Sequence, residues 1–522
     1  MVVRSDAYTV PPLTEYFSRL VTNVPDRVAL VQTDARHTYR KLASSVHACA
    51  CALRSLGVEA GDVVSMQLPN WFEAIVCYLA INRIGAVVNP IIPIYREFEV
   101  GFVLRESASK VLIIPDVYRG RRYTDMLPDL AAPCLRHVVV VRDRTRSPDR
   151  LAQSVLDFDD LISRHRGEAA AVNVGSLDDA LLLYTSGTES NPKGVRHSHA
   201  GLDAEARSMV ADCRLSDDEA IFIASPIGHI AGVDFAVHVP IAMGAKVCLM
   251  DVWDARAATA MIRSEKCRWS SGVTAFLEGL VTAPDASGML SEMSGYRCGG
   301  ADVPPVLIEE AHRKGLYAYR TYGCTEHPTV TGRGADALKA AHTDGLPVAG
   351  TTVRIVDPDD PSSVLPNGEI GEICTIGPEL FLGYRDQSLN SRAFDKDGWF
   401  RTGDLGFLDP DGYLTIAGRK KDIIIRKGEN ISAKQVEDFL AAHPKIKQIA
   451  VIGLPDRDRG ERVCAVVVLA DDTRLSLSDV SEWLIHRGLT RQKIPEQLEI
   501  VDEMPRTPTG KIRKAVLRTR FG

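Results

Sequence analysis

The sequence lacks the patterns that indicate a disulfide-bonded, zinc-binding or membrane-spanning protein. Its eleven cysteines include no Cys-x-x-Cys pair and no histidine at metal-like spacing, so neither a disulfide framework nor a zinc site is expected. No run of about 18 apolar residues occurs, and the first residues carry no apolar core of signal-peptide length. These absences predict a cytoplasmic protein with reduced cysteines and no integral membrane segment.

Charge of one sign is not concentrated on any long stretch either. The formal net charge is -6, and basic and acidic residues are interspersed. A nucleic-acid partner is therefore not expected, because it would require a clustered basic face. The 522 residues exceed the roughly 250–300 at which a single core stops growing, so we expect a large domain and a smaller one.

Between residues 40 and 300, helical patterns alternate with short apolar strands. Examples of the strands are "KVLIIPD" (110–116), "HVVVVRD" (137–143) and "AKVCLMD" (245–251). This alternation is typical of parallel sheets covered by helices. The predicted fold class is α/β, with a large N-terminal domain of parallel-type sheets.

The pattern changes after residue 345, where Asn-Gly and Asp-Gly pairs separate short strands. We expect a small antiparallel β unit there, still within an N-terminal domain of residues 1–417. Strands and helices alternate again beyond "GRKKD" (418–422), which indicates a small α+β C-terminal domain over residues 423–522.

The stretch "LLLYTSGTESNPKG" (181–194) places a polar loop directly after an apolar strand. Its hydroxyls and backbone N–H groups can donate hydrogen bonds to phosphate, its glycines allow close approach, and Lys193 adds a positive charge. The Walker A spacing is not met, because Lys193 precedes Gly194. This chemistry alone leaves both a phosphate-binding loop and an ordinary polar turn open.

Four further stretches follow the loop along the chain: "YGCTE" (322–326), "GWFRTGDLG" (398–406), "GRKKDIIIRKGENIS" (418–432) and "PRTPTGKIRK" (505–514). With the loop, they resemble the ordered core motifs of the adenylate-forming superfamily, which includes acyl- and aryl-CoA synthetases, stand-alone adenylation domains and luciferases. The resemblance spans essentially the whole chain. It implies that a carboxylic acid is activated with Mg-ATP to an acyl-adenylate and then transferred to a thiol, so the expected cofactors are ATP, Mg²⁺ and CoA.

The resemblance implies roles for the residues that would face the phosphates. Thr325 would donate to the α-phosphate, and Glu326 would ligate Mg²⁺ through a hard carboxylate oxygen. Taken alone, "YGCTE" fits a helix start better, with Thr325 as the N-cap. The β- and γ-phosphates would be held by Thr185, Ser186, Gly187, Thr188 and Lys193.

The nucleoside would be bound by residues from three of the motifs and from "CGGAD" (298–302). Tyr322 would stack on the adenine, opposite the small residues Gly299, Gly300 and Ala301. Taken alone, "CGG" also fits a plain Gly-Gly turn. Asp404 would accept hydrogen bonds from both ribose hydroxyls, and Arg419 would reach the ribose or the phosphates.

The resemblance also implies that the C-terminal domain moves between two half-reactions. Lys511 would bridge the substrate carboxylate and the α-phosphate and neutralise charge during the attack on phosphorus. The mobile domain would then swing at a hinge in residues 418–422, about Lys421. This rotation would withdraw Lys511 and bring Gly428 to the tunnel for the pantetheine of CoA.

The acyl pocket is expected between residues 225–235, 271–279 and the approach to "YGCTE". His229 would gate this pocket or contact the carboxylate, whereas an isolated histidine is more often structural. Asp234 lies too far along the chain to bind the α-amino group of an amino acid, although β- or ω-amino acids stay open. Thr321 replaces a glycine that is usual in relatives and would narrow the pocket, which favours a medium-chain, alicyclic or compact aromatic acid.

Glu189 is a second departure, since a carboxylate beside phosphates is repulsive unless it faces solvent or the hydration shell of Mg²⁺. We expect it to point away from the β- and γ-phosphates.

Two alternative functions stay open at this point. A ligase that loads a carrier protein's phosphopantetheine would use the same residues. A non-catalytic homologue is disfavoured, because the charge-handling residues Lys193, Glu326, Asp404, Arg419 and Lys511 are all present. Homodimers are common among relatives, but nothing in the sequence identifies an interface.

Overall fold

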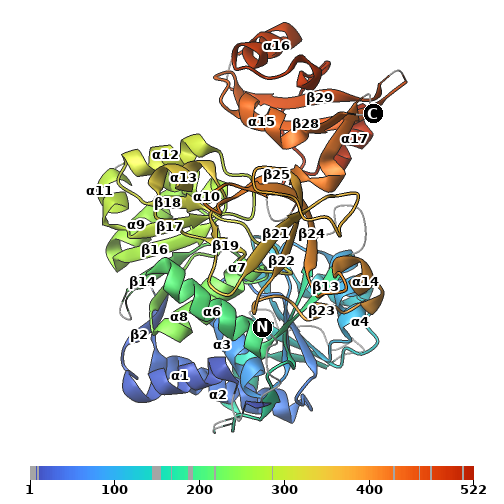
Figure 1. Cartoon of the computed structure of the whole chain (residues 1–522). Coiled ribbons are helices and arrows are strands. Elements are labelled where there is room, and N and C mark those ends of the chain that lie inside the picture. Colours follow the sequence, from blue (N-terminus) through green and yellow to red (C-terminus); the bar gives the residue numbers. More distant parts are fainter. Residues whose placement is uncertain are drawn as a thin grey trace.

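The computed structural model has a large N-terminal part and a smaller C-terminal part, which lies at the top of Figure 1. No helix among the described residues has the length and apolar character needed to cross a membrane. The structure describes residues 7–8, 11–33, 35–143, 154–165, 167, 169–185, 192–214, 216, 219–284, 286–426, 429–457, 459–470, 473–507 and 511–522.

The first sheet of the N-terminal part has eight strands. The first six in spatial order are parallel, and the last two run antiparallel to their neighbours. In spatial order they are β10 (Ser154–Asp157), β9 (His137–Val141), β6 (Val111–Pro115), β4 (Val63–Met66), β5 (Val87–Pro90), β12 (Asp179–Thr185), β13 (Lys193–Ser198) and β23 (Gly383–Tyr384).

The second sheet has seven strands, and all are parallel except the edge strand β3. In spatial order they are β18 (Ala318–Arg320), β17 (Gly295–Cys298), β16 (Cys267–Gly272), β14 (Ala220–Ile223), β15 (Lys246–Leu249), β2 (Val28–Gln32) and β3 (Ala35–Thr38).

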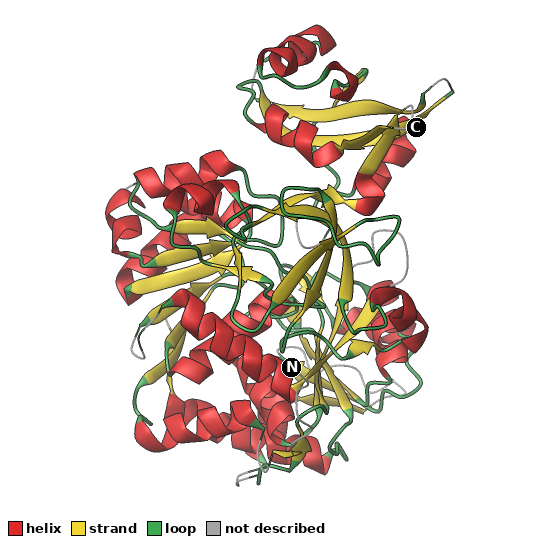
Figure 2. Cartoon of the chain, viewed as in Figure 1, coloured by secondary structure: helices red, strands yellow, loops and turns green. Residues whose placement is uncertain are grey.

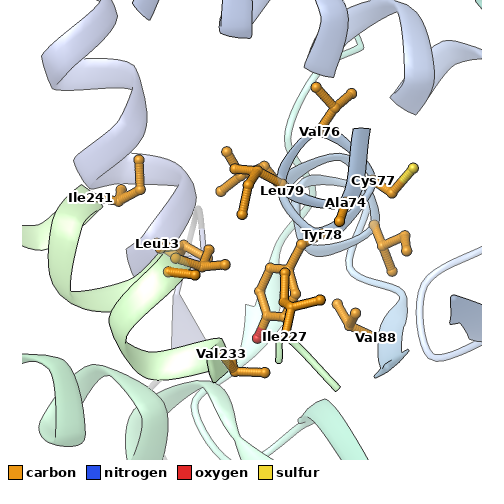
Figure 3. Close-up of a cluster of buried hydrophobic side chains, with 14 of the residues drawn as sticks. Leu13, Ala74, Val76, Cys77, Tyr78, Leu79, Val88, Ile227, Val233 and Ile241 are labelled. Carbon is orange, nitrogen blue, oxygen red and sulfur yellow. The ribbon is translucent and has the colours of Figure 1, made fainter. Parts of the chain in front are cut away.

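Both sheets pack against a shared layer of helices. The largest core cluster takes side chains from both sheets and from this layer, and Figure 3 shows part of it, including Leu13, Tyr78, Val88 and Ile241. Strands buried on both faces need continuous apolar runs, which explains the sequence pattern. The helices of this layer are α1 (Pro12–Asn23), α2 (Tyr39–Ser55), α3 (Phe72–Arg83), α6 (His199–Cys213), α7 (Ile230–Val233) and α8 (Val239–Met243).

Other helices cover the outer faces of the two sheets. On the second sheet these are α9 (Ala255–Glu265), α10 (Thr274–Thr282), α11 (Ala286–Glu292), α12 (Pro305–Arg313) and α13 (Ala337–His342); α4 (Glu97–Ser107) covers the first. The shorter elements are α5 (Phe158–Ser163), α14 (Asn390–Ala393) and the strand pairs β1 (Ala7–Tyr8) with β11 (Val174–Gly175), β7 (Val117–Tyr118) with β8 (Arg121–Arg122), and β19 (Thr331–Gly332) with β20 (Leu346–Pro347).

An antiparallel sheet follows, formed by β21 (Thr352–Val356), β22 (Gly371–Ile376), β24 (Phe400–Leu408) and β25 (Leu414–Arg419). The turn after β24 is closed by a hydrogen bond from the Gly412 N–H to the Asp409 carbonyl at 3.0 Å. Gly412 adopts a φ of 86°, which favours glycine. The Asp-Gly pair therefore forms the turn that its chemistry predicts.

The C-terminal part is a five-stranded sheet with helices packed against it (Figure 2). A short 3-10 turn, Lys420–Asp422, joins β25 to its first strand. Together with the helix-covered parallel sheets and the antiparallel unit, it confirms the predicted α/β fold class. Its elements are β26 (Ile423–Arg426), β27 (Glu429–Ser432), α15 (Ala433–Ala441), β28 (Ile446–Asp456), β29 (Gly460–Leu469), α16 (Leu477–His486), β30 (Gln497–Ile500) and α17 (Lys514–Phe521).

Candidate active site

The polar loop joins two neighbouring antiparallel strands of the first sheet. Thr185, the last residue of β12, pairs with Lys193, the first residue of β13. The loop thus starts at the carboxyl end of a parallel strand, where ligands of α/β sheets usually bind. The predicted phosphate-binding residues Ser186, Gly187 and Thr188, and also Glu189, lie outside the described residues.

The segment Tyr322–Glu326 contains no helix, so the interpretation of Thr325 as a helix N-cap is wrong. The His197 Nε2 atom lies 2.8 Å from the Thr325 carbonyl oxygen. Burial lowers the pKa of His197 to about 4, so the ring is neutral and its Nε2–H donates this hydrogen bond. Because His197 belongs to β13, the bond ties the "YGCTE" segment to the strand that begins at Lys193.

Glu326 receives two hydrogen bonds from the β23 region. The Tyr384 hydroxyl donates to Glu326 Oε1 at 2.8 Å, and the Phe381 N–H donates to the Glu326 carbonyl at 2.9 Å. The described residues contain no cluster of three or more His, Cys, Asp or Glu side chains able to hold a metal. A single carboxylate with one oxygen left fits Mg²⁺, which keeps several waters and binds substrate phosphates.

Tyr322, Asp404 and Arg419 form a connected group at the antiparallel sheet. The Tyr322 hydroxyl donates to Asp404 Oδ2 at 2.7 Å, and Arg419 Nε lies 2.9 Å from Asp404 Oδ1. Asp404 and Arg419 face each other across β24 and β25, and the Asp404 carboxylate raises the pKa of Arg419. A carboxylate has about four acceptor positions, so Asp404 keeps two for further donors such as ribose hydroxyls.

The small residues after β17 lie close to Thr321. A Cβ built on Gly299 would come within 2.8 Å of the Thr321 methyl carbon, so only glycine fits there. Gly300 has a φ of 76°, and its nearest neighbour is a Val273 carbon 3.9 Å from a built Cβ. Gly300 and Ala301 are exposed and provide uncrowded backbone.

Lys511 reaches this group from the C-terminal part. Its backbone carbonyl accepts a hydrogen bond from the Thr507 N–H at 2.7 Å. The residue keeps access to solvent, but partial removal of its ammonium group from water and the nearby Arg419 guanidinium lower its pKa, against the effect of Asp404. Lys511 therefore lies close enough to the Asp404–Arg419 pair to interact with both charges.

His229 lies at the start of α7, where its Nδ1 accepts a hydrogen bond from the Ala231 N–H at 3.3 Å. Burial and the charge of Lys511 lower the pKa of His229 to about 4, so the ring is neutral. The histidine thus has a structural capping role and also lies close to Lys511.

Asp234 opens a π-helical segment, Asp234–His238, between α7 and α8. Its carboxyl is buried, and its Oδ1 atom has no hydrogen-bond partner among the described residues. Burial and the neighbouring Glu205 raise the pKa of Asp234. The segment continues the helix of α7 into α8, and sequence periodicity does not predict its π-helical form.

Several further residues around the site were not predicted from the sequence, among them Tyr384 and His197. Tyr384 contacts Glu326, and its ring centroid lies 5.2 Å from Lys193 Nζ. Neither residue belongs to a motif, and each is recognised only through pairing between distant segments. The side chain of Lys421 and all of Gly428 lie outside the described residues.

Comparison with known proteins gives a family for the whole chain. The family model of the AMP-binding enzymes matches residues 17–385, and that of the AMP-binding enzyme C-terminal domain matches residues 435–511. A medium-chain fatty-acid–CoA ligase of Escherichia coli is 35% identical over 97% of this chain and 90% of its own length. A 2-hydroxy-7-methoxy-5-methyl-1-naphthoate–CoA ligase of Streptomyces carzinostaticus is 32% identical over 98% of this chain and 93% of its own.

Among solved structures, ATP-bound MatB from Rhodopseudomonas palustris matches with a TM-score of 0.87 and 27% identity, over 97% of this chain and 99% of that chain. Its apo form covers the same shares at 28% identity, with a TM-score of 0.77. The chain therefore belongs to the AMP-binding enzyme family, as an AMP-forming acid–thiol ligase of the acyl-CoA synthetase class that uses ATP, Mg²⁺ and CoA.

Proposed function

We propose that this enzyme converts a medium-chain, alicyclic or compact aromatic carboxylic acid to its CoA thioester through an acyl-adenylate. The observation that carries the proposal is the Asp404–Arg419 ion pair beside Tyr322, whose charges also act on the pKa of Lys511 from the C-terminal part. The attacking carboxylate and the α-phosphate are both negative, so adjacent cations lower the barrier to their reaction. The released groups are pyrophosphate in the first step and AMP in the second.

The nucleotide roles follow from the chemistry of each side chain. Asp404 would bind the ribose hydroxyls with its remaining acceptor positions, and Tyr322 would stack on the adenine opposite Gly300 and Ala301. Arg419 would stay beside the ribose and phosphates.

The phosphates would be bound on the other side of "YGCTE". Thr185 and Lys193, at the two ends of the hairpin loop, would hold the β- and γ-phosphates together with the loop between them. Thr325 would donate to the α-phosphate, and Glu326 would hold Mg²⁺, which neutralises phosphate charge when bound. His229, neutral and close to Lys511, would border the acyl pocket near the substrate carboxylate.

For the second step, we propose that residues 423–522 rotate as a C-terminal domain against residues 1–417, about Lys421 in a hinge of residues 418–422. The arrangement with Lys511 at the site would serve adenylation, and the higher TM-score to the ATP-bound than to the apo neighbour supports this assignment. Rotation would remove Lys511 and bring Gly428 to the pantetheine tunnel.

The acid class is inferred from Thr321. Its methyl group packs against Gly299, and its hydroxyl donates to the Thr331 carbonyl, so this side chain fills space that a glycine would leave open. Two relatives, one named for a medium-chain fatty acid and one for a substituted naphthoate, support a carboxylic acid of similar size. CoA is the proposed acceptor, in the cytoplasm, where thiols stay reduced.

A panel of acids tests this function. Pyrophosphate release should be highest with medium-chain or compact aromatic acids, and AMP should then form only when CoA is added. Equal turnover of acetate and palmitate would exclude the acid class. Pyrophosphate exchange without thioester formation would favour a carrier protein as the acceptor, and the solution mass would show whether the enzyme is a homodimer of 57.0 kDa chains.

A further inference from the structure

The edge strand β23 brings a segment from far along the chain against both sides of the proposed polyphosphate site. The Phe381 N–H donates to the Glu326 carbonyl at 2.9 Å, and the Arg385 N–H donates to the Gly194 carbonyl at 2.8 Å. These two bonds fix the backbone on either side of Tyr384. Its side chain is thereby confined between the "YGCTE" segment and the first residues of β13.

The Tyr384 side chain contacts the two charged residues at this point. Its hydroxyl donates to Glu326 Oε1 at 2.8 Å, and its ring centroid lies 5.2 Å from Lys193 Nζ, within the range of a cation–π contact. The residue is only 5% exposed, so both contacts are held in a fixed geometry. A tyrosine hydroxyl is a neutral donor near neutral pH.

We propose that Tyr384 is a positioning residue that aims Glu326 at the metal and Lys193 at the β- and γ-phosphates. The proposal rests on the roles assigned above to Glu326 and Lys193. Among the described residues, neither of these forms an ion pair with the other, although they carry opposite charges and contact the same tyrosine. A neutral side chain between them prevents their mutual neutralisation and leaves each charge available to the nucleotide.

The hydroxyl acts on one carboxylate oxygen only. With Oε1 accepting from Tyr384, Oε2 keeps its acceptor positions for a cation. Partners of this kind fix the orientation of a metal ligand, and their loss typically costs about 10–100-fold in metal affinity.

A purely structural role is the competing explanation, because Tyr384 also packs in an apolar cluster with Val195, Phe381, Ala393 and Phe400. Tyr384→Phe separates the two explanations, since it keeps the ring, the packing and the contact with Lys193 but removes the hydroxyl. Tyr384→Leu removes the ring as well. Tyr317→Phe is the matched control, because its hydroxyl donates to the Gly334 carbonyl at 2.8 Å, away from the site.

The test measures metal binding directly. Mn²⁺ is titrated into the full-length enzyme with a non-hydrolysable ATP analogue and followed by electron paramagnetic resonance, while AMP affinity is measured by calorimetry. Tyr384→Phe should weaken Mn²⁺ binding about tenfold and leave AMP affinity unchanged, because AMP lacks the β- and γ-phosphates. Tyr384→Leu should also weaken binding of the metal-free analogue, through loss of the contact with Lys193.

Wild-type Mn²⁺ affinity in Tyr384→Phe would overturn the proposal, as would an equal loss of Mn²⁺ and AMP binding. The binding measurement tests the role of Tyr384 even if the enzyme turns over no acid of the panel, because it needs no acid substrate. Failure of the proposed function would instead show as absent pyrophosphate release in the wild-type enzyme.

Discussion

At the scale of single residues, Lys511 and Arg419 bring two positive charges next to one carboxylate, Asp404. Partial removal from water, and then the second cation, make the charged form of Lys511 less favourable, which is why its pKa lies below the usual value. The carboxylates of Asp404 and Glu326 act in the opposite direction and favour the charged lysine. An anionic nucleotide and a carboxylate substrate would favour it further on binding.

A pH dependence follows from this lowered pKa. Only the protonated lysine can neutralise the reacting anions, so kcat/KM for adenylation should fall as pH rises through a pKa below the ordinary lysine value of 10.5. In Lys511→Arg this alkaline decline should disappear from the residual activity, because arginine does not deprotonate. The profile is measured by pyrophosphate release, and an unchanged decline in the variant would assign it to another group.

Asp404→Asn tests the ribose assignment. The amide keeps the shape of the side chain but loses its charge, and it leaves Arg419 without its partner. Since hydrogen bonds to charged groups contribute about 1.5–3 kcal/mol, KM for ATP should rise about tenfold or more. AMP affinity should fall as well, because AMP carries the same ribose, in contrast to Tyr384→Phe. Unaltered AMP affinity would contradict the assignment.

At the scale of elements, α6 is joined to β17 by a buried polar cluster. Arg297 Nη2 donates to Thr329 Oγ1 at 2.8 Å, and this hydroxyl donates to Glu205 Oε1 at 2.7 Å. Burial raises the pKa of Glu205 from 4.5 to about 7. The unfolded chain therefore releases this proton at a lower pH than the folded protein does. The free energy of unfolding should fall as the pH rises from 4.5 to about 7.

Glu205→Gln removes that contribution while retaining an acceptor for Thr329. Between pH 4.5 and about 7, the free energy of unfolding should fall less in the variant than in the wild type. The expected difference is on the order of 2 kcal/mol over this range. Urea unfolding at a series of pH values measures it, and parallel curves for the two proteins would exclude the explanation.

The elements themselves divide into those that local sequence determines and those that it does not. The parallel strands were predictable because burial on both faces requires continuous apolar runs, as in β6 and β9. The edge strand Gly383–Tyr384 was not, since it has two residues and exists only through pairing with β13. For the same reason Tyr384 could not be predicted from the sequence, whereas Lys193, Glu326 and Asp404 lie in recognisable motifs.

At the scale of the whole molecule, the C-terminal part contacts the N-terminal part through a small charged group. Lys434 Nζ contacts Asp302 of the other part and lies 2.8 Å from Asp438 Oδ1 within its own helix. Asp302 directly follows Gly300 and Ala301, which are proposed to lie opposite Tyr322 across the adenine. We expect this ion pair to stabilise the arrangement proposed for adenylation.

Lys434→Ala should weaken that arrangement and slow adenylation only a few-fold, because partly exposed ion pairs contribute about 0–1 kcal/mol. Conversion of supplied acyl-adenylate to the thioester should be unaffected. Asp302→Ala should have the same effect, and the double variant should be no slower than either single one. Additive losses would show that the two residues act independently.

The most direct test of the account is to measure the two half-reactions separately in Lys511→Ala. Acid-dependent pyrophosphate release should fall about 10²–10³-fold, as expected for loss of a charge that stabilises the transition state. Thioester formation from supplied acyl-adenylate and CoA should stay close to the wild-type rate, because Lys511 would be withdrawn in that step. Equal losses in both half-reactions, or no loss in the first, would contradict the account.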